Sequence, residues 1–432
     1  MHLYFLFIRI AAFFGHRKAR DMVRGQRHTI GQLQALSPAQ GPTVWIHAAS
    51  VGEFEQARPI IELLKSEQPQ TRIVVTFFSP SGYNLRKDYR LADAVVYLPF
   101  AIRRNARNLL NVMRPDIAVF VKYEWWPAYL KELAKRNIPT YSISAIFRPH
   151  QLFFLPWGKP YKNLLKVFKT IFVQDDASKQ LLLKHGIDHV QVAGDTRFDR
   201  VQEIANLAKD LPVIEAFTSS YRWGERTPWD NTSYGRIIIA GSTWNEDEKL
   251  LARYLHNHPE VRLILAPHEI HDAHLHQIFE LFEGRYVRLT DFAGSSNEFQ
   301  PARDARVLVV DTIGLLSSIY RYGHVAYIGG GFGAGIHNTI EAAVFDMPVI
   351  FGPKYEHFRE AKALIAAGGG QSVKNYSQLE QALEHALANH ESMGRLAGDY
   401  VRSELGATHT IYNEIFTNAR HLNTGEKSIQ ND

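Results

Sequence analysis

The stretch TVWIHAASVGEFEQARPIIELLKSEQPQTRIVVTFF, residues 43–78, decides the fold because it holds one complete β-α-β unit. VWIHAA and RIVVTFF are short apolar runs of the length of buried strands, and GEFEQARPIIELLKSE between them has the length and spacing of a helix. Two strands joined by a helix run parallel in one sheet. We therefore expect a parallel sheet that extends outward from this unit.

The same alternation continues on both sides of one interruption. Residues 219–235, SSYRWGERTPWDNTSYG, are polar and rich in turn-forming residues, and we interpret them as a linker. Before the linker, further strands are expected at 94–100, 117–126, 138–147, 170–175 and 189–194. After the linker, strands are expected at 236–242, 261–267, 285–289, 307–314, 324–331 and 347–353. The sequence therefore predicts an α/β protein with two doubly wound, Rossmann-like domains.

The expected domain limits follow from this pattern. They are an N-terminal helix with a basic segment at 1–30, a first domain at 31–218, the linker at 219–235, a second domain at 236–424 and a tail at 425–432. Open parallel sheets bind ligands beyond the carboxyl ends of their strands. We expect the site in a cleft between the two domains.

Composition excludes several classes of protein. The chain has 432 residues, of which 45% are hydrophobic and 22% charged, so it is neither disordered nor a coiled coil. The absence of cysteine excludes disulfides, thiolate metal sites, iron–sulfur clusters and cysteine nucleophiles. The 49 basic and 44 acidic residues give a net charge of +5 without a basic stripe, so we expect no nucleic-acid partner and favour a surface attracted to anionic lipid.

The N-terminal segment MHLYFLFIRIAAFFG, residues 1–15, is apolar and is followed by a cluster of basic residues at 16–28. It is too short to cross a bilayer, which takes about 20 apolar residues. A signal peptide would carry its charges before the apolar run. The pattern favours a helix that lies in the interface of an anionic leaflet. The alternative is a first helix that packs on the protein's own core.

The first candidate site is HAASVGE, residues 47–53, at the end of the strand that opens the β-α-β unit. Ser50 and Glu53 have the spacing of a capping box, in which each side chain bonds the backbone amide of the other. Glu53 also lies where an α/β sheet binds its ligand, and Gly52 leaves room for a substrate beside it. A partly buried carboxylate there could act as a general base. The helix cap and the general base are therefore alternative roles for Glu53.

The second candidate site is GGGFGAGIHNTIE, residues 329–341, between an expected strand and a helix that begins near Thr339. A glycine loop before a helix exposes amides that favour phosphate. Asn338 and Glu341 again have capping spacing, and Glu341 could instead accept from ribose hydroxyls. Part of the loop fits a dinucleotide fingerprint, but no acidic residue ends the next strand, so we expect no nicotinamide or flavin cofactor.

Two further observations bear on chemistry. Glu124 lies in YEWWP, residues 123–127, at a strand end, where a carboxylate beside two tryptophans is costly unless it is paired or faces a cleft. The histidines show no HExxH or other close metal-binding spacing, so we expect no metal.

Taken in order, several motifs resemble those of the 3-deoxy-D-manno-octulosonic acid (Kdo) transferases, over about residues 5–420. The motifs are HAASVGE at 47–53, YEWWP at 123–127, AGDTRFD at 193–199, AGSTW at 240–244, APHE at 266–269, DTIG at 311–314 and GGGFGAGIHNTIEAA at 329–343. The resemblance implies a GT-B fold with an N-terminal membrane-associated helix. It also implies metal-independent, inverting transfer of Kdo from CMP-Kdo to the lipid A precursor lipid IVA, in lipopolysaccharide biosynthesis. The implied location is the inner membrane, as a peripheral or monotopic protein with its active site facing the cytoplasm, without a cofactor.

The resemblance also assigns residues by position. It implies that Glu53 is the general base and that Glu124 and Arg197 stabilise the transition state. It implies that CMP-Kdo is bound by Pro267, His268, Ile313, Gly314, Leu315, Asn338, Thr339, Ile340 and Glu341. Three positions depart from the family, which often has Lys at Arg197, Arg at His268 and Glu at Leu315; arginine and lysine differ in geometry though not in charge.

Two rival functions remain. One is another GT-B transferase or a sugar-nucleotide epimerase that uses a UDP-sugar, which would share the architecture and Glu341. The other is a non-catalytic membrane-bound scaffold that retains a nucleotide-binding fold.

Overall fold

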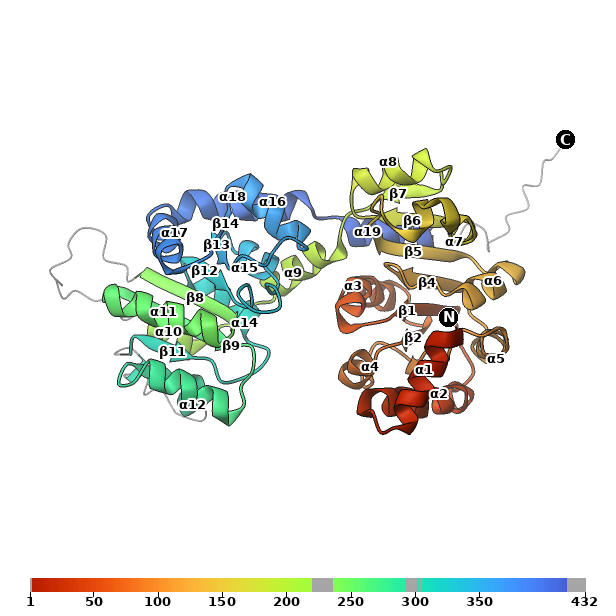
Figure 1. The fold of residues 1–432 in the computed structure, drawn as a ribbon, viewed down its shortest axis with the longest axis horizontal. Coiled ribbons are helices and arrows are strands. Elements are labelled where there is room, and N and C mark those ends of the chain that lie inside the picture. The colour runs from red at the N-terminus through yellow and green to blue at the C-terminus, as the bar shows by residue number, and fades with distance from the viewer. Residues whose placement is uncertain (1, 220–235, 293–300, 303–304, 418–432) are drawn as a thin grey trace. The chain divides into compact units, whose positions relative to one another are not determined.

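A computed structural model describes residues 2–219, 236–292, 301–302 and 305–417. Over these residues the chain forms two compact units, one of residues 2–199 with 405–417 and one of the described residues between 200 and 404 (Figure 1). Each unit is a parallel sheet flanked by helices, as expected.

The first unit contains a seven-stranded sheet in the order β3-β2-β1-β4-β5-β6-β7, and every neighbouring pair is parallel. The strands are β1 (Thr43–Ala48), β2 (Arg72–Phe77), β3 (Ala94–Tyr97), β4 (Ile117–Val121), β5 (Thr140–Ala145), β6 (Thr170–Val173) and β7 (Val190–Val192). All seven were expected from their apolar runs. These runs are nearly continuous because helices cover both faces of a parallel sheet.

Helices fill both sides of this sheet. They are α1 (His2–Phe13), α2 (Arg17–Gln34), α3 (Val51–Glu67), α4 (Pro80–Arg86), α5 (Arg103–Met113), α6 (Pro127–Lys135), α7 (Lys159–Leu165), α8 (Asp176–Lys184) and α19 (Ala407–Tyr412), with the short η1 (Leu152–Phe154), η2 (Pro156–Gly158) and the π-helical η5 (Asn413–Thr417). Helix α9 (Thr196–Asn206) runs across the boundary between the units.

Alternate residues of β1 enter two different cores. Trp45 packs with Met22 of α2 and Leu109 of α5 on one face of the sheet. Val44 packs with Phe54 of α3 on the other. The period of two in a strand sends successive side chains to opposite faces. The central strand is therefore buried along its whole length.

The second unit repeats the architecture, with a parallel sheet in the order β10-β11-β9-β8-β12-β13-β14. The strands are β8 (Arg236–Thr243), β9 (Val261–Pro267), β10 (Tyr286–Arg288), β11 (Val307–Val309), β12 (Val325–Ile328), β13 (Val349–Phe351) and β14 (Gly370–Ser372). The first six were expected. The edge strand β14 was missed because GQS has no apolar run.

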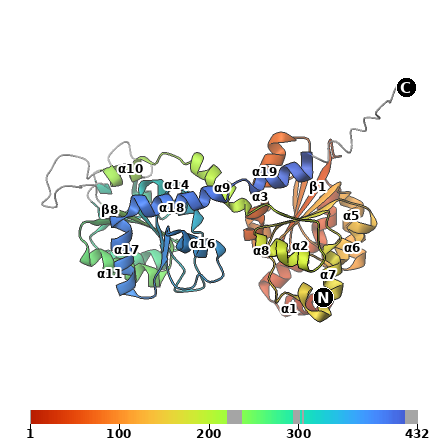
Figure 2. The same ribbon diagram turned by 90° about the horizontal axis from the view of Figure 1, so that it is seen from above.

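Its helices again cover both faces, as a view turned by 90° shows (Figure 2). They are α10 (Pro212–Ser219), α11 (Asn245–Asn257), α12 (Asp272–Leu281), α14 (Leu316–Ile319), α15 (Ile340–Ala343), α16 (Arg359–Ala367), α17 (Tyr376–Ala388) and α18 (His390–Ser403), with η3 (Leu289–Phe292) and η4 (Tyr320–Tyr322).

The units differ from the expected limits of 31–218 and 236–424 at two places. Residues 405–417 join the first unit, because Ile411 and Ile415 enter the core that α3 lines. Residues 200–218 join the second unit, where Leu211 donates its backbone N–H to the Tyr322 hydroxyl at 2.9 Å. The expected linker, apart from residue 219, and the tail lie outside the described residues.

Helix α1 packs on the first unit through one side only. Phe5 is buried and stacks on Phe100, with ring centroids 4.7 Å apart. Five large apolar side chains on α1 and just beyond its end are exposed: Leu6, Phe7, Ile10, Phe13 and Phe14. In the ranges that the structure describes, no helix has both the length and the apolar character that a bilayer crossing requires.

Candidate active site

The two candidate carboxylates of the first unit meet at one edge of its sheet. Glu53 lies at the start of α3, just after β1, and Glu124 lies between β4 and α6. Because β1 and β4 are parallel neighbours, their carboxyl ends lie side by side. The topology therefore brings together two motifs that are 71 positions apart in the sequence.

Glu53 forms part of the expected cap. Its backbone N–H donates to Ser50 Oγ at 3.4 Å, as capping predicts. Its carboxylate Oε2 accepts from the Ala49 amide at 2.6 Å, whereas a capping box would use the amide of Ser50. Within the described ranges, Oε1 accepts no hydrogen bond. One carboxylate oxygen thus fixes the side chain and the other is available.

The pKa of Glu53 is raised above its ordinary value. Burial is the main cause, and the negative charge of Glu124 adds to it. The Ala49 amide, His47 and Lys122 lower the pKa by smaller amounts. Glu53 is therefore more basic when ionised than an exposed glutamate, which suits it to accept a proton.

Glu124 is held by Trp126. The indole Nε1–H lies 3.0 Å from Glu124 Oε2 and 3.1 Å from His47 Nε2, so it donates to both. His47 is fully buried, and its Nδ1 lies 3.0 Å from the carbonyl oxygen of Thr76. Because that carbonyl only accepts, Nδ1 carries a proton, and Nε2 is the ring nitrogen that faces Trp126. This hydrogen bond offsets part of the cost that a carboxylate beside two tryptophans would otherwise carry.

Arg197, at the start of α9, is engaged by Asp195. Its Nε and Nη2 donate to Asp195 Oδ2 at 2.9 and 2.7 Å. Burial of Asp195 alone would raise the pKa of that carboxyl, but the charge and hydrogen bonds of Arg197 lower it below its ordinary value. Gln56, one turn after Glu53 on α3, donates to Asp195 Oδ1 at 3.4 Å. Arg197 is thereby tied to the helix that carries Glu53.

Lys122 completes this group and was not predicted as a site residue. It follows β4 with φ +55°, the left-handed region that ordinary side chains rarely adopt. Its positive charge lowers the pKa of both Glu53 and Asp195. The signal in the sequence was its place directly after an apolar strand. We name Lys122, Glu53, Glu124 and Arg197 the charged edge.

In the second unit, three rings stack at the sheet edge. Trp244, after β8, stacks on His268, after β9, at 4.8 Å between centroids. His268 stacks on His337 at 4.3 Å. Burial lowers the pKa of His337, and the neighbouring His268 lowers it further. The structure thus brings the predicted His268 together with Trp244 and His337, which the prediction had not assigned to binding.

The glycine loop differs from the expectation that its amides are exposed. The amide of Gly330 donates to the buried Asp247 at 2.9 Å, and the amides of Gly333 and Gly335 donate to the Gly330 carbonyl. A Cβ on Gly331 would lie 2.5 Å from the Cα of Gly352. These glycines therefore allow close packing of the loop, and the amides of 330, 333 and 335 are satisfied internally.

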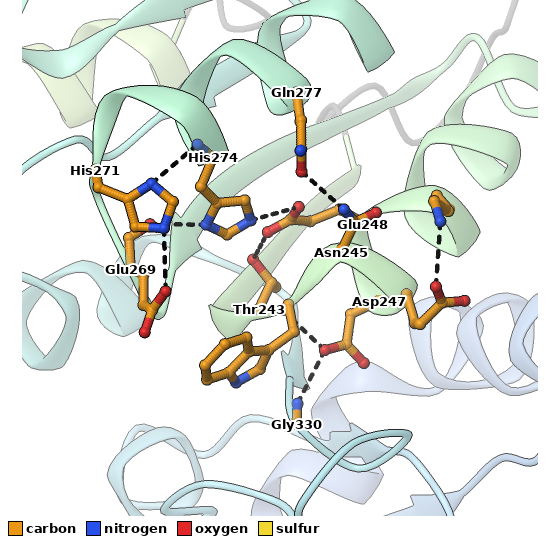
Figure 3. A network of polar contacts seen from close by, with 12 residues as sticks. Thr243, Asn245, Asp247, Glu248, Glu269, His271, His274, Gln277 and Gly330 are labelled. Carbon is orange, nitrogen blue, oxygen red and sulfur yellow. Dashed lines mark hydrogen bonds and ion pairs between the residues drawn. The ribbon is translucent and has the colours of Figure 1, made fainter.

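A buried polar network supports this edge (Figure 3). Asp247 also accepts from the Tyr327 hydroxyl at 2.7 Å and from the Trp244 amide at 3.0 Å. Glu248 is fully buried and accepts from Thr243 Oγ1 at 2.9 Å. His274 Nε2 lies 3.0 Å from Glu248 Oε2, while His274 Nδ1 lies 2.9 Å from a backbone carbonyl. Nδ1 donates its proton to that carbonyl, which would leave Nε2 and the Glu248 carboxylate as two acceptors facing each other. A further proton must therefore lie between Nε2 and Oε2.

The segment from Asn338 to Glu341 does not form the expected cap. Helix α15 has only four residues, and its N-cap Thr339 makes no side-chain cap hydrogen bond. Asn338 Nδ2 donates to Glu341 Oε1 at 2.8 Å, and Asn338 Oδ1 accepts from the Ile340 amide at 3.3 Å. Asn338 therefore orients the Glu341 carboxylate directly.

The remaining predicted residues lie on the carboxyl side of β9 and β11. Pro267 ends β9 and is buried, whereas Ile313 is 86% exposed and Gly314 has φ +91°. Leu315 is half-buried. In the described ranges, no hydrogen bond or ring contact links residues 313–315 to the ring stack. No set of three or more histidine, aspartate or glutamate side chains there is arranged to hold a metal ion.

Comparisons with known proteins place this geometry in context. Residues 24–200 match the family model described as 3-Deoxy-D-manno-octulosonic-acid transferase (kdotransferase). The chain is 28% identical over 373 residues to the 3-deoxy-D-manno-octulosonic acid transferase of Haemophilus influenzae, covering 83% of this chain and 82% of that protein. It is 26% identical over 365 residues to the enzyme of the same name from Chlamydia trachomatis, covering 81% of this chain and 79% of that protein.

Solved structures add the fold. The chain matches UDP-GlcNAc 2-epimerase from Neisseria meningitidis bound to UDP-GlcNAc with a TM-score of 0.57, covering 87% of this chain and 100% of that one. Sequence identity is only 15%, so this likeness shows the architecture alone. The two Rossmann-like units are of the GT-B type.

Proposed function

We propose, from the premise that this chain belongs to the 3-deoxy-D-manno-octulosonic acid (Kdo) transferase family, that it moves Kdo from CMP-Kdo to the lipid A precursor lipid IVA. The observation that carries the proposal is the environment of Glu53. Its carboxylate is anchored through one oxygen at a sheet edge, and its pKa is raised by burial and by Glu124. These are the properties of a general base.

In the proposed step, Glu53 takes the proton from an acceptor hydroxyl. The hydroxyl oxygen attacks the anomeric carbon of Kdo, the bond from that carbon to the phosphate oxygen of CMP breaks, and CMP leaves with the electron pair. Attack opposite the leaving group inverts the anomeric centre. A carboxylate with a raised pKa is a better proton acceptor at neutral pH than an ordinary one.

We propose supporting roles for the rest of the charged edge. Glu124 raises the proton affinity of Glu53, and its negative charge would also stabilise positive charge that develops on the sugar. Arg197 and Lys122 are the cations of the group, suited to the carboxylate of Kdo or to the leaving phosphate. Asp195 holds Arg197 in place, which limits the reorganisation needed during transfer.

The second unit is the proposed donor site. His268 and the residues 313–315 and 338–341 all follow strands of one sheet, on the side where such sheets bind nucleotides. The ring stack of Trp244, His268 and His337 offers a surface for the base or ribose. The Glu341 carboxylate, held by Asn338, suits ribose hydroxyls. The family resemblance implies transfer without a metal, and this remains part of the proposal.

We also propose that the protein acts at the cytoplasmic face of the inner membrane, as a peripheral or monotopic protein. The exposed apolar side of α1, with Phe7 60% and Phe13 85% exposed, supports this. Basic residues that follow α1 add attraction to anionic lipid. The acceptor is itself a lipid, so catalysis at the interface would bring enzyme and substrate together.

The direct test is incubation of the full chain with CMP-Kdo and lipid IVA. We expect release of CMP with formation of a Kdo-lipid product of the corresponding mass. A parallel incubation with UDP-GlcNAc tests the rival epimerase or transferase. Turnover of the UDP-sugar without Kdo transfer would contradict the proposal.

A further inference from the structure

A cavity of about 780 Å³ lies in the first unit between α1, α2, α5 and the loop after β3. Its volume is in the range of small-ligand sites. It is separate from the residues of the charged edge, none of which lines it. Its lining residues have no role in the proposed chemistry of transfer.

Among the residues that the structure describes, the cavity lining includes four arginines and no carboxylate. Arg20, Arg24 and Arg27 line it from α2, and Arg9 lines it from α1. The three on α2 are spaced four and three residues apart, so they share one face of the helix. Like charges at this spacing repel one another and destabilise an empty helix face. A bound anion would remove that repulsion.

An unsatisfied donor belongs to the same wall. Gln26 lines the cavity, and its Oε1 accepts from the Phe100 amide at 3.1 Å. Its Nε2 is buried and has no hydrogen-bond partner in the described part of the chain. Buried donors in folded proteins are almost always paired.

The rest of the lining is apolar and leads to the exposed side of α1. Phe13 lines the cavity although it is 85% exposed, and Phe14 beside it is 80% exposed. Phe100 lines the cavity under the guanidinium of Arg9, which lies 5.5 Å from its ring centre. A free anion would not use these apolar surfaces. They suit a ligand that carries an acyl chain beside its anionic group.

We propose that this cavity binds the phosphate group of a membrane lipid through Arg20, Arg24 and Arg27. Arginine forks match phosphate oxygens, and several together favour phosphate over a single carboxylate. The phosphate belongs either to a phospholipid of the bilayer or to a phosphorylated lipid acceptor. Only the second source rests on the proposed function.

Packed side chains link the wall of the cavity to the charged edge within the same unit. Phe5 of α1 stacks on Phe100 of the cavity wall and lies 6.0 Å from the ring of Trp126. Trp126 in turn donates to Glu124. A lipid bound here would therefore contact α1, which packs against Trp126, the hydrogen-bond donor to Glu124.

The test measures binding of the full chain to phosphatidylcholine vesicles with and without phosphatidic acid. The Arg24→Gln, Arg27→Gln double variant is compared with Arg17→Gln, Lys18→Gln, which removes the same charge from the same helix outside the cavity. We expect the cavity variant to lose at least about tenfold more affinity for phosphatidic acid vesicles than the control. Equal losses would mean diffuse surface attraction and would overturn the proposal.

A second variant guards against misfolding. Asn108→Asp keeps every arginine and adds a carboxylate to the α5 wall of the cavity. We expect it to weaken binding about threefold or more, by repulsion of the phosphate. Binding as tight as wild type in this variant, with its melting temperature unchanged, would also overturn the proposal.

The source of the phosphate is identified by a third set of vesicles, neutral except for lipid IVA or its dephosphorylated form. Cavity-dependent binding only to phosphatidic acid assigns the site to bilayer phospholipid, and cavity-dependent preference for phosphorylated lipid IVA assigns it to the acceptor. Binding is measured without CMP-Kdo, so it is independent of transfer. Phosphate-dependent binding without any transfer would refute the proposed function and leave this inference intact.

Discussion

At the edge of the first sheet the carboxylate of Glu53 accepts one hydrogen bond in the described part of the chain, whereas at the edge of the second sheet Asp247 accepts three. Burial raises the pKa of both. Asp247 is 1% exposed and holds the glycine loop, while Glu53 is only partly buried. In the same architecture, a carboxylate whose oxygens are all hydrogen-bonded stabilises the fold, and a carboxylate with a free oxygen is available for chemistry.

The comparison predicts opposite results for substitution at the two edges. Glu53→Gln keeps an acceptor for the Ala49 amide but removes the base, so we expect kcat for Kdo transfer to fall about 10²–10⁴-fold. Glu67→Gln, at the exposed end of the same helix, is the matched control and should keep wild-type activity. Transfer by Glu53→Gln at near the wild-type rate, in folded protein, would reduce Glu53 to a helix cap.

At the second edge the larger effect is on stability. Asp247→Ala leaves the amides of Gly330 and Trp244 and the Tyr327 hydroxyl without their acceptor, so we expect a loss of roughly 2–4 kcal/mol in the free energy of unfolding. Chemical denaturation measures this loss. Glu246→Ala, whose side chain is 71% exposed, should cost almost nothing. If the two variants unfold alike, the network does not support the loop.

Substitution in the ring stack tests whether it contributes to the proposed donor binding and not to chemistry. Trp244→Ala removes the stacking partner of His268 but keeps the backbone amide that Asp247 accepts. We expect KM for CMP-Kdo to rise roughly two- to tenfold, with kcat little changed. Trp157→Ala, a 71% exposed tryptophan of the first unit, is the control. A fall in kcat at constant KM would assign Trp244 to another role.

The smallest effect concerns the stability of the first edge. Since the folded pKa of Glu53 is raised, folding favours its protonated form, and ionisation costs stability as pH rises through that pKa. Glu53→Gln removes this cost, so it should melt roughly 1–3 °C higher at pH 8. The difference should shrink as pH falls towards the ordinary pKa of glutamate. Destabilisation at pH 8 would mean that the carboxylate is more important to folding than its pKa implies.

Much of the fold was predictable because parallel strands buried on both faces are short apolar runs. The edge strand β14 has no such run and was missed. The return of residues 405–417 to the first unit could not be predicted either. The apolar periodicity of Ile411 and Ile415 predicts that they are buried, but it does not identify the core in which they pack.

For the candidate site, the sequence predicted which residues lie at the ends of strands, but not which of them meet. Glu53 and Glu124 were each expected at a strand end, but a β-α-β unit makes only consecutive strands neighbours, so the pairing of β1 with β4 that brings them together was not predicted. The pairing of Asp195 with Arg197 and Gln56 depends on how α9 meets α3, which no local pattern encodes. The glycine loop was expected to offer free amides, but the Gly330 amide donates to Asp247, which is distant in the sequence.

The pH dependence of kcat tests most directly whether Glu53 is a base whose pKa depends on Glu124. The base must be ionised, so the rate falls as pH decreases through the raised pKa of Glu53. We predict an acidic limb with an apparent pKa above the ordinary 4.5, which moves to lower pH in Glu124→Gln because a neighbouring negative charge is removed. An acidic limb at the ordinary value, or one that Glu124→Gln leaves in place, would contradict the account.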